Sequence, residues 1–172
     1  MPVMCPSSIW RLMTPDDLIS VTSLATQIHT DYPEDAAVFA NRLQLAPDGC
    51  FVLSKGALIE GYILSHPWFG CITPKLNAIL TALPQAPDRW YIHDIVLSPA
   101  TRGLGLAGTG IALMETIARS YALPCISLVS TRLALKFWEK QGFTPENISK
   151  EEEKVLASYD PEARLLSRII AD

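Results

Sequence analysis

The sequence contains few cysteines, and their spacing fits neither a metal site nor a redox centre. The four are Cys5, Cys50, Cys71 and Cys125, and no two of them form a CxxC pair, so a zinc ribbon or redox motif is not expected. Reduced, mostly buried thiols are typical of a cytoplasmic protein. The first ten residues also lack a basic region followed by an apolar run, so we expect no signal peptide and a cytoplasmic location.

Long apolar stretches and an excess of basic residues are also absent. No run of about 18 apolar residues occurs, so no membrane-spanning helix is expected. Lysine and arginine number 14 against 18 aspartate and glutamate residues, which gives a net charge of −4. A protein that binds the phosphates of nucleic acid needs a basic face. We therefore expect neither a nucleic acid nor a membrane as the main partner.

The composition predicts one globular domain that covers residues 1–172. Apolar residues make up 49% and charged residues 19% of the chain, enough to build one hydrophobic core without disulfides. Apolar runs predict strands, and apolar residues at helical spacing predict helices. The strands are expected at 9–13, 50–54, 57–65, 89–97, 125–129 and 163–170, with an extended segment from 143, and the helices at 14–32, 35–45, 106–122 and 131–141.

Two segments give weaker patterns. Four prolines interrupt 66–88, which we interpret as a surface excursion with at most a short helix near 76–83. The stretch 151–159 predicts no definite element, and its three glutamates at 151–153 are interpreted as a solvated face. The resulting order β-α-α-β-β-β-α-β-α-β-β predicts a mixed α/β fold.

A glycine-rich loop between a strand and a helix is the most informative part of the sequence. It contains Gly103, Gly105 and Gly108, which allow tight turns and a close approach of a ligand to the backbone. The helix that follows presents unpaired amide groups and the positive end of its dipole. Arg102 adds a charge at the mouth of the loop. This arrangement predicts a site for a phosphate or pyrophosphate group.

Two general interpretations of the loop are weak. The spacing of its glycines matches the dinucleotide-binding fingerprint, but residues 98–102 separate the glycines from the strand. No acid stands near 129–131, where that fold would place a ribose ligand. A turn needed only for packing is the other interpretation, and it leaves the surrounding pattern unexplained.

A longer pattern around the loop resembles the GNAT acyl-CoA N-acyltransferases, a family of N-acetyltransferases. Arg102-x-x-Gly105-x-Ala107 is similar to the family motif (Gln/Arg)-x-x-Gly-x-(Gly/Ala), and Leu97-x-Pro99 and ALKFWEKQGF at 134–143 also match. The resemblance implies a mixed, mostly antiparallel central sheet flanked by helices. It also implies transfer of an acetyl group from acetyl-CoA directly to a primary amine in a ternary complex, without a metal.

The resemblance further implies which residues bind acetyl-CoA. Pantetheine would pair with the backbone of strand 89–97 as an added strand, and the Leu97 amide would face the thioester carbonyl. The diphosphate would lie on the amides of the loop and the following helix. The implied binding residues are Ile95, Leu97, Arg102, Gly103, Leu104, Gly105, Leu106, Ala107, Gly108, Thr131 and Trp138.

Candidate catalytic residues lie on the same strand. An amine must be neutral to attack a thioester, and an alkylammonium has a pKa of roughly 10, so a base is needed. Family members often carry a Glu or His base here, which implies His93 as the first candidate and Asp94 as the second. A buried core histidine and a packing carboxylate are the alternatives. Strand alternation predicts Tyr91, His93, Ile95 and Leu97 on one face and Asp94 on the other.

The chain departs from the family pattern at two positions. Trp138 stands where many members carry the tyrosine that protonates the departing thiolate, and Thr131 where many carry asparagine. Because an indole N–H is not a usable acid, a catalytically degenerate acyl-CoA-binding or regulatory module is the alternative to an enzyme. His29 is interpreted only as a helix-end residue that suits the helix dipole. The acceptor is expected to be a small-molecule or peptide amine, and the protein a monomer or homodimer.

Overall fold

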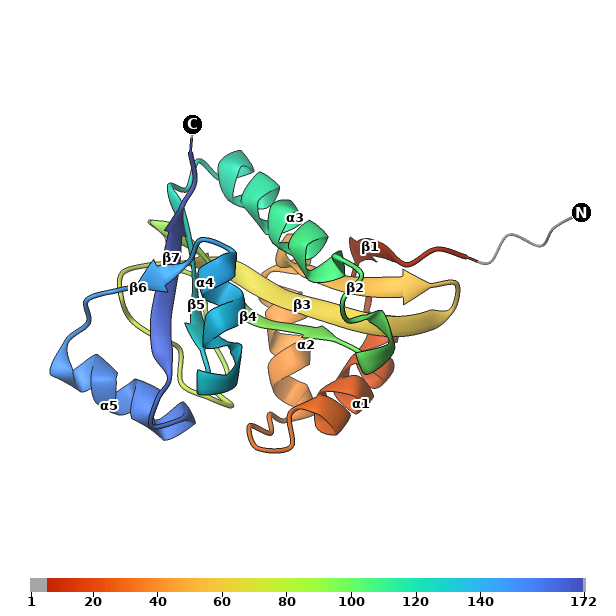
Figure 1. Ribbon diagram of the computed structural model, residues 1–172, viewed down its shortest axis with the longest axis horizontal. Coiled ribbons are helices and arrows are strands. Elements are labelled where there is room, and N and C mark those ends of the chain that lie inside the picture. The colour runs from red at the N-terminus through yellow and green to blue at the C-terminus, as the bar shows by residue number, and fades with distance from the viewer. Residues whose placement is uncertain (1–5, 172) are drawn as a thin grey trace, which may run out of the picture.

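The computed structural model describes residues 6–171, which form one seven-stranded sheet (Figure 1). The strands lie in the order β1-β2-β3-β4-β5-β7-β6. Neighbouring strands are antiparallel, apart from the parallel pair β4 and β5. Their bounds are β1 (Ile9–Leu12), β2 (Cys50–Lys55), β3 (Leu58–Trp68), β4 (Arg89–Leu97), β5 (Cys125–Ser130), β6 (Thr144–Pro145) and β7 (Arg164–Ile169).

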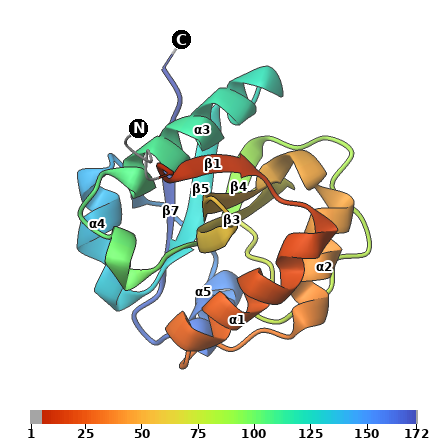
Figure 2. The same ribbon diagram turned by 90° about the vertical axis from the view of Figure 1, so that its right-hand side faces the viewer.

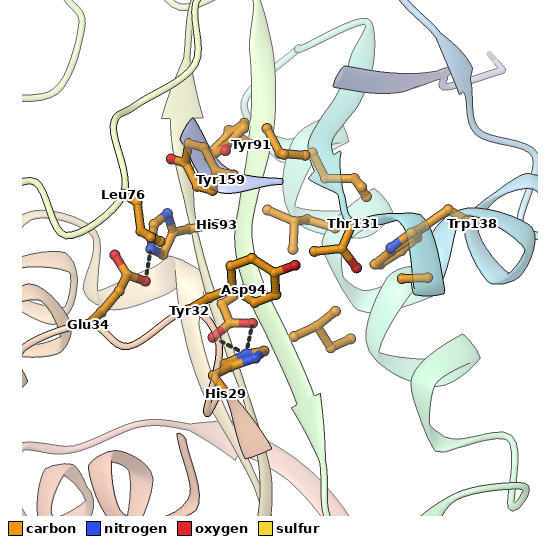
Figure 3. A pocket seen from close by; sticks show the side chains of 15 residues that line it. His29, Tyr32, Glu34, Leu76, Tyr91, His93, Asp94, Thr131, Trp138 and Tyr159 are labelled. Atoms are coloured by element: carbon orange, nitrogen blue, oxygen red, sulfur yellow. Dashed lines mark hydrogen bonds and ion pairs between the residues drawn. The ribbon is translucent and has the colours of Figure 1, made fainter. Parts of the chain in front are cut away.

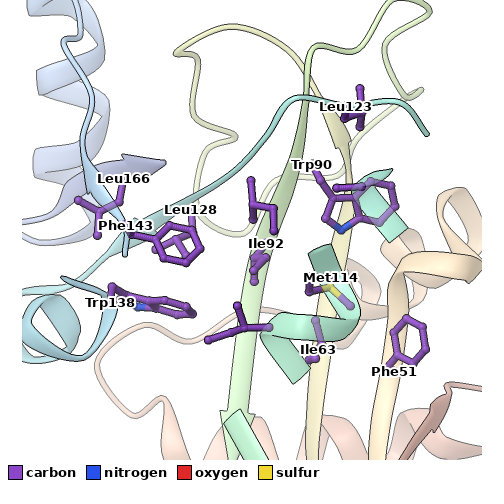
Figure 4. Close-up of a cluster of buried hydrophobic side chains, with 13 residues drawn as sticks. Phe51, Ile63, Trp90, Ile92, Met114, Leu123, Leu128, Trp138, Phe143 and Leu166 are labelled. Carbon is purple, nitrogen blue, oxygen red and sulfur yellow. The ribbon is translucent and has the colours of Figure 1, made fainter. Parts of the chain in front are cut away.

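Helices cover both faces of this sheet (Figure 2). They are α1 (Leu18–Ile28), α2 (Ala36–Leu45), α3 (Leu106–Ser120), α4 (Leu135–Lys140) and α5 (Lys150–Tyr159). On one face, Met114 of α3 and Trp138 of α4 bury against Trp90 and Ile92 of β4 (Figure 4). On the other face, α1 and α2 form a second cluster with β2 and β3. The mixed, mostly antiparallel fold predicted from the sequence is confirmed, and none of the described helices is long and apolar enough to cross a bilayer.

The segment between β3 and β4 contains no helix at 76–83, so that prediction is wrong. Asn77 has a left-handed backbone, with φ of 59°, which does not continue a helix. The side chain of Asn41 from α2 pairs with both the N–H and the C=O of Leu80, so these backbone groups are satisfied by tertiary contacts instead. The predicted surface excursion at 66–88 is also shorter in the structure, because β3 continues to Trp68.

The stretch 151–159 forms helix α5, which lies between β6 and β7 in the chain. The Ser149 side chain caps its start by accepting a hydrogen bond from the Glu152 N–H, at 3.2 Å. The three glutamates occupy the first turn, where the helix dipole stabilises negative charge. The three glutamates interpreted as a solvated face therefore also begin a helix. Leu156 is buried on the inner side of this helix.

The strands β4 and β5 separate part of the way along their length. They pair from Trp90 opposite Ile126 to Ile92 opposite Leu128, and no pair follows within the described chain. In the remaining part of β4, residues 94–97 are paired with β3 on the other side. One edge of this part of β4 therefore keeps its backbone N–H and C=O groups free for a ligand.

An ion pair with a nearly buried carboxylate fixes the start of α1. Both terminal nitrogens of Arg11 donate to the Asp17 carboxylate, at 2.8 and 2.9 Å, and the Thr14 N–H donates to it at 2.8 Å. The Asp17 side chain is only 10% exposed. The hydrogen bond from Arg11 outweighs burial and lowers the pKa of Asp17 to about 2.

This ion pair predicts a specific loss of stability in acid. A carboxyl group whose pKa is lowered by folding stabilises the protein above its unfolded pKa of about 4, and this contribution disappears as the pH falls toward 2. We expect a loss of about 1–2 kcal/mol in the free energy of unfolding, since Arg11 is partly exposed and screened. Urea unfolding of the wild type and Asp17→Asn at several pH values tests this. Equal pH slopes for the two proteins between pH 4 and 2 would contradict it.

Candidate active site

The glycine-rich loop leads from β4 to α3 and surrounds open space. Gly103 and Gly105 have φ of 79° and 75°, a backbone conformation that favours glycine. Gly105 immediately precedes α3, and no side chain in the described residues caps that helix. A Cβ atom at Gly103, Gly105 or Gly108 would meet nothing within 4 Å. Free amide groups beside open space fit a diphosphate.

Two cavities follow the free edge of β4. The outer cavity extends from the glycine-rich loop between β4 and α4, and the inner cavity continues between β4, β5 and the segment after α1 (Figure 3). Four residues line both cavities, so the two form one continuous cleft: His29, Ile95, Ala134 and Trp138. A long ligand with a polar head at α3 would reach the inner cavity along β4.

Most of the sequence-predicted binding residues meet at this cleft. Ile95, Leu97, Arg102, Gly103, Ala107 and Trp138 line the outer cavity, and Thr131 lines the inner cavity. Gly105 and Gly108 lie at the start of α3. Leu104 projects outward at the loop, with 68% of its surface exposed, and the Leu106 carbonyl accepts a hydrogen bond from Trp10, at 3.0 Å. Neither of these two residues lines the inner or the outer cavity.

A bulge in β4 places His93 and Asp94 on the same side of the sheet. The pairing of β3 with β4 shifts register here and skips His93. Both side chains bond to residues at the end of α1 or just after it, whereas Ile95 packs in the α3-side cluster. The predicted alternation, with His93 and Ile95 on one face and Asp94 on the other, is therefore wrong, because a bulge shifts the phase of a strand by one residue.

His93 forms an ion-pair geometry with Glu34 inside the inner cavity. Its Nε2 lies 2.7 Å from Oε1 of Glu34, and the two side chains are only 3% and 8% exposed. Burial alone would raise the pKa of Glu34, but the hydrogen bond and charge of His93, with further help from Asn77 and Arg42, lower it. The other ring nitrogen of His93, Nδ1, is buried without a partner among the described residues. This nitrogen is the one free to take up a proton.

A second imidazole–carboxylate pair joins α1 to β4. The His29 Nε2 lies 2.9 and 3.0 Å from the two oxygens of Asp94, and the Tyr62 hydroxyl donates to the same carboxylate at 2.5 Å. The hydrogen bond to Asp94 outweighs burial and raises the pKa of His29. The interpretation of His29 as a helix-end residue alone missed this contact, because Asp94 lies 65 residues away in the sequence.

Aromatic side chains complete the walls of the cleft. Trp138 is almost fully buried, with its ring centroid 5.0 Å from that of Phe137 and 5.3 Å from that of Phe143, so it forms a rigid wall. Tyr91 and Tyr159 line the inner cavity, and burial raises the pKa of both phenols. They therefore remain neutral near pH 7. No group of three His, Cys, Asp or Glu side chains that could hold a metal occurs within residues 6–171.

Comparison with curated proteins identifies one distant relative. The chain is 25% identical over 154 residues to the tRNA(Met) cytidine acetyltransferase TmcA of Saccharolobus islandicus. The match covers 85% of this chain but 19% of the relative, so the chain spans about a fifth of that protein's length.

Solved structures share the fold of this chain, and a family model matches most of its sequence. The GNAT-like decarboxylase GphF in complex with isobutyryl-CoA has a TM-score of 0.78, with 14% identity and coverage of 95% of this chain and 100% of that one. Naa50 of Arabidopsis thaliana, in complex with a bisubstrate analogue of CoA, has a TM-score of 0.69, with 15% identity and coverage of 94% and 98%. The model of the acetyltransferase (GNAT) family matches residues 15–143. The chain therefore belongs to the GNAT acetyltransferase family.

Proposed function

We propose that this protein transfers an acetyl group from acetyl-CoA directly to a primary amine, with both substrates bound at once. The observation that carries the proposal is the continuous cleft along the free edge of β4, with the glycine-rich loop at one end and two imidazole–carboxylate pairs at the other. Bound acetyl-CoA supplies an activated thioester. The protein has to bind this thioester, admit an amine, remove a proton from the amine and supply a proton to the departing sulfur.

The backbone of β4 and the start of α3 would hold acetyl-CoA. The free edge over residues 93–97 offers backbone groups of Ile95 and Leu97 to pantetheine. The amides around Gly105 would bind the diphosphate, with Arg102 at the mouth. Ala107 keeps the outer cavity open because its side chain is a single methyl group. Trp138 separates this channel from the core.

The His93–Glu34 pair would act as the base for the incoming amine. Glu34 holds Nε2 and orients the ring, so it is a positioning residue. Nδ1 can then accept the proton that an alkylammonium must lose, directly or through a water molecule. The alternative base, Asp94, already accepts hydrogen bonds from His29 and Tyr62. These contacts favour His93 for the role.

The inner cavity favours an amine over a larger anionic acceptor. Glu34 and Asp94 line it, and Asp160, which bonds to Tyr32, lies beside it. These carboxylates would attract a cationic small molecule or a peptide N-terminus and would repel nucleic-acid phosphates. The solved structure of Naa50 contains the bisubstrate analogue CoA-Ac-MVNAL. That complex is consistent with an amine acceptor in this fold.

An amine panel tests this function. The protein is incubated with acetyl-CoA and amines that include polyamines, amino acids and peptides, and the release of free thiol is followed. We expect turnover with at least one cationic amine. Tight binding of acetyl-CoA without turnover on any amine would instead support a degenerate acyl-CoA-binding module, for which the replacement of the usual tyrosine by Trp138 is the favouring feature.

A further inference from the structure

His29 lies where the outer and inner cavities meet. It lines the inner cavity together with His93 and Asp94 (Figure 3). It also lines the outer cavity together with Leu97 and Trp138. An acyl-CoA that enters from the glycine-rich loop must pass this imidazole to present its acyl group to the inner cavity. The two histidines therefore stand at different places along the path of the substrates.

The hydrogen bonds of His29 select the nitrogen that can exchange a proton. Nε2 points at both oxygens of Asp94 and therefore carries a hydrogen. Nδ1 has no hydrogen-bond partner among the described residues, and the side chain is 31% exposed. Asp94 is itself held by Tyr62. The ring is thus fixed in orientation and still open to the cleft.

The charges around His29 favour its imidazolium form. Asp94 from β4 bonds to it, Tyr62 from β3 bonds to Asp94, and Glu34 follows α1 in the chain. Tyr32 lines the same cavity, and Arg102 is the positive group on the outer side. The Asp94 hydrogen bond, partly opposed by burial and assisted by Glu34, raises the pKa of His29 above its usual 6.5. These contacts stabilise the protonated form of the ring.

The reaction requires an acid as well as a base. An ammonium and a thioester give an amide, a thiol and one free proton, so one proton must leave the site and another must reach sulfur. The family resemblance places Trp138 at the position of the tyrosine that supplies this second proton in many members. The indole N–H of Trp138 cannot donate a proton to the thiolate. Without another acid, the thiolate would leave unprotonated.

We propose, on the basis of the proposed acetyl transfer, that His29 is the acid that protonates the departing sulfur. As the C–N bond forms and the C–S bond breaks, the C–S electron pair goes to sulfur and His29 donates its Nδ1 proton there. The neutral imidazole, held by Asp94, then takes the remaining excess proton from the new amide nitrogen and returns to its starting form. The first ammonium proton leaves through His93 to solvent.

A binding experiment without turnover tests the position of His29. The chain has three histidines, so their imidazole signals can be followed by NMR, and His29→Gln assigns one of them. We expect CoA to shift the signal and pKa of His29, and desulfo-CoA, which lacks the sulfur, to shift them much less. Equal responses to the two ligands would overturn the inference while leaving acyl-CoA binding intact. Failure of both ligands to bind would overturn the proposed function itself.

Kinetics provide the second test. His29→Gln is expected to lower kcat about 100-fold, with little change in the KM for acetyl-CoA, and to abolish the alkaline limb of the kcat profile. Gln27→Ala, an exposed change on the same helix, is the control and should leave the kinetics unchanged. In the double variant with Trp138→Tyr, the phenol should restore kcat at least tenfold. A His29→Gln enzyme that keeps both its kcat and its alkaline limb would refute the role.

Discussion

Replacing Ala107 with leucine is expected to weaken the binding of CoA by at least 100-fold, about 2.7 kcal/mol. Ala107 lies in the first turn of α3 and lines the outer cavity beside Gly103 and Arg102. Three additional carbon atoms would occupy the space next to the amides that are proposed to bind the diphosphate. Isothermal titration calorimetry with CoA measures the change directly.

The matched control is Ala112→Leu on the same helix. Ala112 is exposed and lies outside both cavities, so the same increase in side-chain size should leave CoA affinity within about twofold, a difference below 0.5 kcal/mol. Both variants should retain wild-type thermal stability, because neither side chain enters the core. An Ala107→Leu protein that binds CoA as tightly as the wild type would show that the ligand does not pass this helix start.

Replacing His93 with glutamine is expected to lower kcat by about 100- to 1000-fold, as for the loss of a general base. Glutamine keeps a polar group near Glu34 but cannot accept a proton at neutral pH. The acidic limb of the pH profile should disappear with the base. Measurements of kcat and KM across pH, with an amine identified from the panel, provide the test.

Glu34→Gln separates orientation from proton transfer. This variant keeps His93 and a hydrogen-bonding partner but removes the negative charge beside Nε2, so we expect a smaller loss of kcat than in His93→Gln, about 10-fold. Unfolding experiments on both variants control for stability, since loss of one partner of a buried pair can destabilise a fold. An acidic limb that is unchanged in His93→Gln would remove His93 from the role of base.

Local sequence patterns predict most strands of the sheet and the glycine-rich loop. Apolar patterns along β2, β3, β4 and β5 predict those strands, and the glycines before α3 mark a turn that side chains cannot easily adopt. Trp138, from the segment 134–143 that resembles the family, lines the cleft in the structure. These predictions succeed because each depends on residues that are neighbours in the chain.

The contacts of the candidate site depend instead on tertiary structure. Glu34 contacts His93 at a sequence separation of 59 residues, and His29 contacts Asp94 at a separation of 65. No spacing pattern in the sequence predicts either pair. The bulge at His93 is equally hidden, because it arises from the register of β3 against β4. An acid in the loop after the first predicted helix is a weak signal for Glu34, and it becomes informative only once α1 is placed beside β4.

A crystal structure of the protein with CoA tests the proposed binding mode. We expect the diphosphate to lie on the backbone amides between Arg102 and Gly108, pantetheine to run along residues 95–97 of β4, and the sulfur to lie near His29. Density for a well-ordered CoA whose diphosphate contacts another part of the surface would contradict this binding mode.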